Sequence, residues 1–162
     1  MRVCGSLSPL ESVLRVSKKT KWGSVELAML ADLLYGPARV LNGAKLDDVE
    51  LIRASNEAFD GRPFCVVRQW MLLDVMLPAS QEQEVITQGL KPCVLYAQAT
   101  VYDSQGVLKP GDSLLSDFQR DFDGCIFESK DRLYILAGRG ARKHVSVPAV
   151  AALHKSLSRL VR

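Results

Sequence analysis

The chain has 162 residues, of which 48% are hydrophobic and 24% charged, and its formal net charge is +3. A folded chain of this length buries roughly 70% of the surface that its unfolded form exposes, and the composition excludes disordered, collagen-like and disulfide-scaffold proteins. Its apolar runs stop well short of the roughly 20 residues that a membrane span requires, so the sequence predicts one globular domain over residues 1–162.

The first part of the chain, residues 1–61, is predicted to be helical. We expect a short helix from Glu11 to Lys18, a longer one from Val25 to Tyr35, and a third between residues 46 and 59, after a turn at Asn42-Gly43. Apolar side chains recur at helical spacing in the second and third helices, which predicts that they face the core. They are Leu27, Leu30, Ala31 and Leu34 in the second helix and Leu46, Val49, Leu51, Ile52 and Phe59 in the third.

Residues 62–147 are predicted to form a mainly antiparallel, barrel-like sheet. The run from Phe64 to Val75 begins with β-branched and aromatic residues, which favours a strand buried on both faces, with a buried helix as the alternative. A short polar helix is expected from Gln81 to Gln88, and a strand from Val94 to Tyr102. Two apolar runs, residues 125–128 and 133–137, flank a polar turn and predict a β-hairpin.

The last part, residues 148–162, is predicted to be a helix that closes the open side of the sheet. It begins at Ser146 or Val147 and carries Pro148 in its first turn, where proline is favoured. Its apolar stripe is Val150, Leu153, Leu157, Leu160 and Val161. Together these elements predict an α+β domain with N-terminal helices, a small antiparallel sheet and a C-terminal helix.

Two groups of side chains are candidate partner-binding surfaces. The outer face of the Val94 to Tyr102 strand is amphipathic and is expected to be partly exposed; it consists of Tyr96, Gln98, Thr100 and Tyr102. A flexible glycine-flanked loop is expected to present the cations Arg139, Arg142 and Lys143. Tyrosine and arginine are enriched where binding energy concentrates. The alternative is that the N-terminal helices cover the tyrosines and that the cations are merely solvated.

The charge is distributed unevenly along the chain. Residues 103–131 carry seven acids and three basic residues, whereas residues 132–162 carry seven basic residues and no acid. Such a split predicts a gradient of electrostatic potential across the surface. The basic C-terminal segment is suited either to an acidic protein face or to a phosphate backbone.

No motif for catalysis, a cofactor or a metal ion is present. The Gly138–Gly140 segment lacks the third glycine of a dinucleotide-binding fingerprint. The Asp121–Gly124 segment resembles a calcium loop, but Lys130 falls where a bidentate glutamate is needed. His144 and His154 are the only histidines and have no zinc-ligand spacing with the cysteines. We therefore predict no catalytic residue, no cofactor and no metal site.

The four cysteines stand at least 28 positions apart, at Cys4, Cys65, Cys93 and Cys125. This spacing excludes a zinc clip and a dense disulfide framework, so we expect buried reduced thiols. Polar residues and a proline interrupt the N-terminal segment, which therefore lacks the continuous apolar region of a signal peptide. A cytoplasmic protein is the resulting expectation.

Three segments, residues 62–70, 94–112 and 125–143, contain the patterns RPFCVVR-x-W, VLYA with DS-x-G and PGD, and CIFE with LYIL-x-G-x-G-x-RK. Together they resemble a family of small proteins of unknown function found in pseudomonads and their mobile elements, over about residues 60–147. The resemblance implies a bacterial accessory protein and carries no known active site.

We predict a non-enzymatic protein-binding module, an inhibitor or adaptor encoded on a mobile element that acts on a larger bacterial host complex such as a defence complex. The first alternative is a small basic nucleic-acid-binding protein that uses the C-terminal basic loop and helix, although the aromatic pattern of an RNA-recognition sheet is absent. The second alternative is an enzyme without a recognisable motif. No membrane partner is expected, and the oligomeric state stays open.

Overall fold

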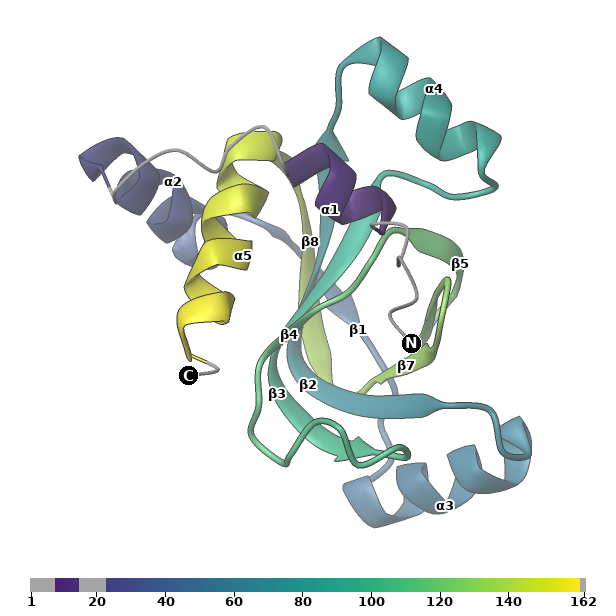
Figure 1. The fold of residues 1–162 in the computed structure, drawn as a ribbon. Coiled ribbons are helices and arrows are strands. Elements are labelled where there is room, and N and C mark those ends of the chain that lie inside the picture. The colour runs from purple at the N-terminus through teal and green to yellow at the C-terminus, as the bar shows by residue number, and fades with distance from the viewer. Residues whose placement is uncertain (1–7, 15–22, 161–162) are drawn as a thin grey trace, which may run out of the picture.

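The computed structural model describes residues 8–14 and 23–160, which form five helices and eight strands. The helices are α1 (Pro9–Leu14), α2 (Ser24–Tyr35), α3 (Asp48–Phe59), α4 (Ala79–Thr87) and α5 (Val147–Leu160). The strands are β1 (Arg39–Asn42), β2 (Phe64–Met76), β3 (Cys93–Asp103), β4 (Leu114–Leu115), β5 (Gln119–Asp123), β6 (Ile126–Ser129), β7 (Leu133–Leu136) and β8 (Arg139–Ser146). Figure 1 shows the strands in the middle of the molecule and α4 projecting at the top. The predicted α+β class is confirmed.

The strands form one mixed sheet in the order β1-β8-β2-β7-β6-β5, while β3 pairs with the other edge of β2 and β4 pairs with β3. β2 is antiparallel to β3 but parallel to both β7 and β8. Five of the seven strand pairs in the described residues are antiparallel, as expected, and the two parallel pairs make the sheet mixed. The barrel-like closure that was expected is corrected, because the sheet does not close. Parallel pairing arises here because the chain returns to β2 through a long crossover and not through a hairpin.

β2 is the central strand, and it changes one neighbour half-way along its length. Residues Phe64–Val67 pair with β7, whereas residues Met71–Met76 pair with β8. Between them Gln69 has a φ of 53°, in the left-handed region, and the strand is irregular there. On one face of β2, the side chains therefore come from odd-numbered residues before Gln69 and from even-numbered residues after it. Cys65, Val67, Trp70 and Leu72 consequently share one hydrophobic cluster. The predicted strand from Phe64 to Val75 is confirmed.

β1 is an edge strand where the sequence predicted only a turn at Asn42-Gly43. It pairs antiparallel with β8. Beyond it, the backbone N–H groups of Gly43 and Ala44 donate to the carbonyl oxygens of Gly138 and Leu136, each at 2.8 Å. A Cβ atom on Gly43 would collide with the Leu136 carbonyl. Glycine is thus needed for the close approach of two backbones and not for a tight turn.

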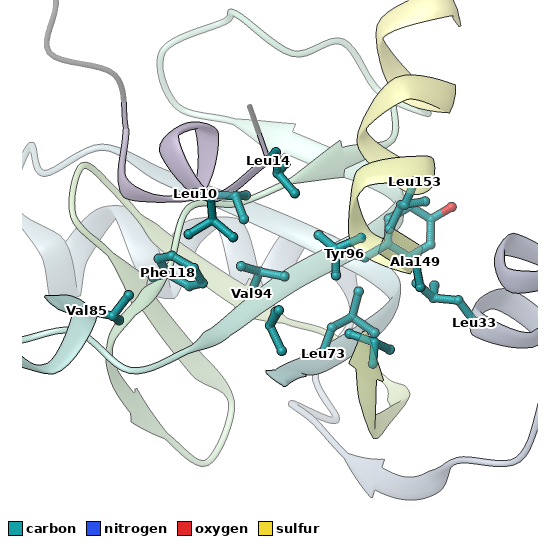
Figure 2. Close-up of a cluster of buried hydrophobic side chains, with 14 of the residues drawn as sticks. Leu10, Leu14, Leu33, Leu73, Val85, Val94, Tyr96, Phe118, Ala149 and Leu153 are labelled. Carbon is teal, nitrogen blue, oxygen red and sulfur yellow. The ribbon is translucent and has the colours of Figure 1, made fainter. Parts of the chain in front are cut away.

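One hydrophobic cluster lies between the sheet and the helices α1, α2 and α5, as Figure 2 shows. Its strand residues Leu73, Val94 and Tyr96 face side chains of the three helices. Those helix residues include Leu10 and Leu14 of α1, Leu33 of α2, and Ala149 and Leu153 of α5. The helices therefore cover the face of the sheet on which Tyr96 lies.

The predicted closing helix is confirmed as α5. Ser146 caps it, because the Ser146 Oγ accepts a hydrogen bond from the Ala149 N–H at 3.2 Å. Val150 and Leu153 are buried as expected, and Leu157 is half-buried. The remaining stripe positions, the Leu160 side chain and Val161, lie outside the described residues.

The buried faces of α2 and α3 differ in part from those expected. Leu33 of α2 is 1% exposed and Leu51 of α3 is 5% exposed, so these two residues anchor the helices. The expected core positions that are instead exposed are Leu27 and Ala31 in α2, Val49 in α3, and Leu46, which lies before the start of α3. Both segments contain more apolar side chains than one face can hold, and spacing alone does not select the buried face.

The first expected helix is present as α1, which spans Pro9–Leu14. The rest of that prediction, residues 15–18, lies outside the described residues. None of the helices in residues 8–14 and 23–160 has the length and hydropathy needed to cross a membrane.

Candidate functional site

The tyrosine face of β3 is not the open surface that the sequence predicted. Tyr96 is 8% exposed because helices α1, α2 and α5 pack over it. Thr100 is 2% exposed on the opposite face of the sheet, where it pairs with Val67 of the cluster that contains Cys65. Tyr102 is half-buried, and its ring lies 5.7 Å from the ring of Phe64. Gln98 is exposed. The prediction is therefore wrong at Tyr96 and Thr100, which offer no contact area to a partner.

The expected basic loop is a strand, since Arg139, Arg142 and Lys143 belong to β8. Arg142 donates two hydrogen bonds to the Asp74 carboxylate, from Nε to Oδ2 and from Nη2 to Oδ1, each at 2.8 Å. Lys143 Nζ donates to the carbonyl oxygens of Asp32 at 2.6 Å and Leu33 at 3.1 Å, near the C-terminal end of α2 where the helix dipole favours a cation. Of the three, Arg139 is exposed, whereas Arg142 and Lys143 are half-buried.

Other basic side chains of the C-terminal segment also have partners inside the molecule. Arg132 lies 3.5 Å from the Asp103 carboxylate, and Lys155 lies 3.6 Å from that of Glu26. With Arg142 and Lys143 they account for four of the five basic side chains described after residue 131. The excess of positive charge seen in the sequence is thus largely matched by internal acids and carbonyl groups, which weakens the argument for a phosphate-binding surface.

A cleft of about 740 Å³ lies at the C-terminal end of β2, beside β8 and α4. A second cavity of about 440 Å³ lies under the C-terminal end of α4 and shares Asp74, Pro92 and Arg142 with the cleft. The Asp74–Arg142 pair therefore stands between the two hollows. Sequence reasoning missed Asp74, although an acid inside the apolar run of β2 was a usable signal.

The two charged groups of this pair stabilise each other's ionised form. Burial alone would raise the pKa of Asp74, but the hydrogen bonds and charge of Arg142 hold it below its ordinary value. The hydrogen bonds with Asp74 in turn raise the pKa of Arg142. A carboxylate held this way is a poor proton acceptor near neutral pH, because general bases work best with a pKa near the working pH.

The cysteine next to this pair is not an activated nucleophile. Burial, followed by the negative charge of Asp74, raises the pKa of the Cys93 thiol to about 12. Burial likewise raises the pKa of Cys65 to about 11. Both remain thiols at neutral pH, whereas nucleophilic cysteines have a lowered pKa. Among the described residues no group of three or more His, Cys, Asp or Glu side chains is placed to hold a metal ion.

The Asp74–Arg142 pair makes the stability of the fold depend on pH in the acidic range. Because the folded-state pKa of Asp74 is lowered, the stabilisation is complete above the unfolded pKa of about 3.9 and is lost as the pH falls through the folded value. We expect the free energy of unfolding to fall between about pH 5 and about pH 2, and less steeply in Asp74→Asn than in the parent chain. Urea unfolding followed by circular dichroism at each pH measures this. Equal slopes for the two chains would contradict it.

Exposed apolar side chains gather in one stretch of the chain. Nine large hydrophobic side chains are exposed in the described residues, and six of them lie between residues 25 and 49. These six, which we call the apolar stretch, are Val25, Leu27, Tyr35, Val40, Leu46 and Val49. They lie on α2, on the edge strand β1, and around the start of α3. Tyr35 is 86% exposed and Val49 77%.

Fold and site together define an α+β domain with an open mixed sheet, a central ion pair between two hollows, and an apolar stretch that runs from α2 through the edge strand β1 to the start of α3. Residues 42–152 match the family described as "Domain of unknown function (DUF6957)". The match covers more than half of the chain, and the chain belongs to this family. No curated protein and no solved structure matches the chain. The expected relationship to a family of unknown function is confirmed.

Proposed function

We propose that the protein is a non-enzymatic protein-binding module and that the apolar stretch forms its contact surface. The observation that carries the proposal is the concentration of six of the nine exposed large apolar side chains in residues 25–49. Single exposed apolar residues are ordinary on protein surfaces, whereas contiguous patches of them mark sites of interaction. The edge strand β1 connects the C-terminal end of α2, where Tyr35 lies, to the segment before α3, where Leu46 lies. The Asp74–Arg142 ion pair and the protonated Cys93 thiol beside it offer no comparable support for catalysis.

The edge strand β1 supplies a way of binding. It pairs with β8 on one side and with no described strand on the other, which leaves backbone groups for an added strand. Val40, in the middle of β1, is 58% exposed. A partner that adds an extended segment here would gain main-chain hydrogen bonds from β1 and side-chain contacts from α2 and α3.

The charges around this edge indicate the chemistry of the partner. Between residues 24 and 50 the chain has five acids and two basic residues. Asp48 is paired with Arg68 at 2.7 Å, whereas Asp32, Asp47 and Glu50 are exposed. The segment that fits is therefore extended, apolar at alternate positions, and flanked by lysine or arginine.

The proposal includes the setting in which the module works. The resemblance to small proteins of pseudomonads and their mobile elements supports a larger bacterial complex as the partner, with this chain as its inhibitor or adaptor. The thiols of Cys65 and Cys93 are free, as is usual in the reducing cytoplasm, which supports a cytoplasmic site of action.

Site-specific photo-crosslinking in the native host cell tests the contact surface. A photoreactive phenylalanine at Tyr35 is expected to capture one protein, and the same group at Val107, which is 72% exposed and outside the apolar stretch, is expected not to. Val40→Lys should weaken the complex by about tenfold or more, because a cation on the edge repels a basic segment and disfavours strand addition. Val107→Lys is the matched control.

Two results would overturn this function. Capture that is equal from both positions, or absent from both, would show that the apolar stretch is not a specific contact surface. Recovery of nucleic acid alone, released by salt, would favour the nucleic-acid alternative.

A further inference from the structure

The cavity of about 440 Å³ under α4 contains a buried polar group that has no hydrogen-bond partner in the part of the chain that the structure describes. Gln119, the first residue of β5, is 4% exposed and lines this cavity. Its side-chain oxygen Oε1 makes no hydrogen bond with any described residue. A buried acceptor left unpaired costs free energy, so it indicates a missing donor. The apolar stretch contributes no residue to this cavity, and the inference is independent of the proposed function.

The backbone of Gln119 is anchored, and its side chain is buried. The Gln119 carbonyl oxygen accepts a hydrogen bond from the Lys91 N–H at 2.8 Å, which ties the start of β5 to the segment before β3. A ligand atom beside Oε1 therefore meets a buried acceptor on an anchored segment and not an exposed surface amide. The group that fits is a hydrogen-bond donor such as an amide N–H, since an amide oxygen can only accept.

Two cationic side chains, Arg142 and Lys91, line the same cavity. Arg142 uses Nε and Nη2 for Asp74, and no hydrogen bond is formed by its remaining nitrogen, Nη1, with the described residues. Lys91 lines the cavity and is exposed. Because Asp74 is neutralised by Arg142, Lys91 leaves the cavity with excess positive charge. These groups favour a carboxylate, which accepts hydrogen bonds from both side chains.

The rest of the lining is apolar. Ile86 and Leu90, at the end of α4 and just beyond it, and Pro92 contribute to the wall. The volume falls within the roughly 300–1,000 Å³ that is usual for small-ligand sites. A ligand with one apolar side chain next to its polar groups would match both the apolar lining and the polar groups of the cavity.

We propose that this cavity binds a carboxylate with an adjacent amide N–H and an apolar side chain, the chemistry shared by an N-acyl amino acid and the C-terminal residue of a peptide. The amide N–H donates to Gln119 Oε1. Arg142 and Lys91 hold the carboxylate, and the side chain packs against Ile86, Leu90 and Pro92.

Titration of the ¹⁵N-labelled chain followed by NMR tests the site. N-acetyl-leucine is expected to shift the Gln119 side-chain amide and the Lys91 backbone signal, and to bind about tenfold more tightly than N-acetyl-leucinamide, which lacks the charge. An acetylated tetrapeptide that ends in leucine distinguishes the sources. Tighter binding by the tetrapeptide supports a peptide C-terminus, and equal binding supports a small metabolite.

Variants separate binding from structure. Gln119→Met keeps the side-chain length and removes the unpaired oxygen, so it should leave stability equal or raised while affinity for N-acetyl-leucine drops about tenfold. Lys91→Glu, at an exposed side chain, should weaken the same probe without unfolding the chain. Gln98→Met, at an exposed glutamine of β3, is the matched control and should bind as the parent does. Unchanged affinity in both cavity variants, or shifts that do not involve Gln119, would overturn the proposal.

Discussion

Gly140→Ala is expected to lower the free energy of unfolding by about 3 kcal/mol, because the added methyl group has no space. A Cβ atom on Gly140 would collide with the ring atoms Cδ2, Cε2 and Cε3 of Trp70. Trp70 is 1% exposed, and its Nε1 donates to the Ala137 carbonyl oxygen at 3.3 Å, so the ring cannot move aside freely. β8 would have to shift instead, and with it the pairing to β1 and β2.

Urea unfolding followed by circular dichroism measures this effect. Gly23→Ala is the control, because a Cβ atom there meets nothing within 4 Å and the residue has ordinary backbone angles. We expect it to cost about 1 kcal/mol or less. The double change Gly140→Ala with Trp70→Leu should lose less than the sum of the single changes, since the smaller side chain relieves the collision. Stability of Gly140→Ala within about 0.5 kcal/mol of the parent would contradict the observed packing.

Arg142→Leu is expected to destabilise the fold by about 2 kcal/mol or more, because it leaves the Asp74 carboxylate partly buried without a partner. The Asp74 side chain is only 23% exposed, so water screens its charge incompletely. The value expected is below the roughly 3–5 kcal/mol of fully buried pairs for the same reason. Replacing both residues, with Arg142→Leu and Asp74→Leu together, should recover much of the loss, since no charge is then left unpaired.

A double-mutant cycle on these two residues measures their coupling free energy. Arg139→Leu is the matched control on the same strand, because Arg139 is exposed and forms no ion pair with the described residues. It should change stability by no more than about 0.5 kcal/mol. Equal losses for Arg142→Leu and Arg139→Leu would show that the Asp74 pair does not stabilise the fold.

The Asp74–Arg142 pair also affects ligand binding at the cavity that Arg142 lines. If Arg142 holds Asp74 and also contributes a donor to a carboxylate, the Asp74→Asn variant keeps the cavity lining while it loosens Arg142. We expect N-acetyl-leucine to bind this variant at least as tightly as the parent, because Asp74 no longer competes for the guanidinium. This outcome is measured in the same NMR titration.

Elements whose cause is local could be predicted from the sequence. β2 begins at Phe64 as expected, because β-branched and aromatic residues favour a strand and Pro63 precedes it. The hairpin of β6 and β7 and the cap of α5 at Ser146 also depend on neighbouring residues only. Each of these features is decided within a few positions of the chain, where propensity and spacing act.

Features that depend on contacts between residues distant in the sequence could be seen only in the tertiary structure. The direction of β7 and β8 relative to β2, the edge strand β1, and the exposure of the apolar stretch depend on which surfaces meet. Asp74 and Arg142 are 68 positions apart, and only their strand register brings them together. Likewise, an alternating strand pattern predicts that Tyr96 and Thr100 share an exposed face, whereas Tyr96 lies under the helices and Thr100 pairs with Val67 of the cluster on the other face. The sequence by itself determined the class and the local elements, because these follow from short-range physics. The candidate sites follow from long-range packing. This packing pairs Arg142 with Asp74 and buries Tyr96, two side chains that the sequence predicted to be exposed.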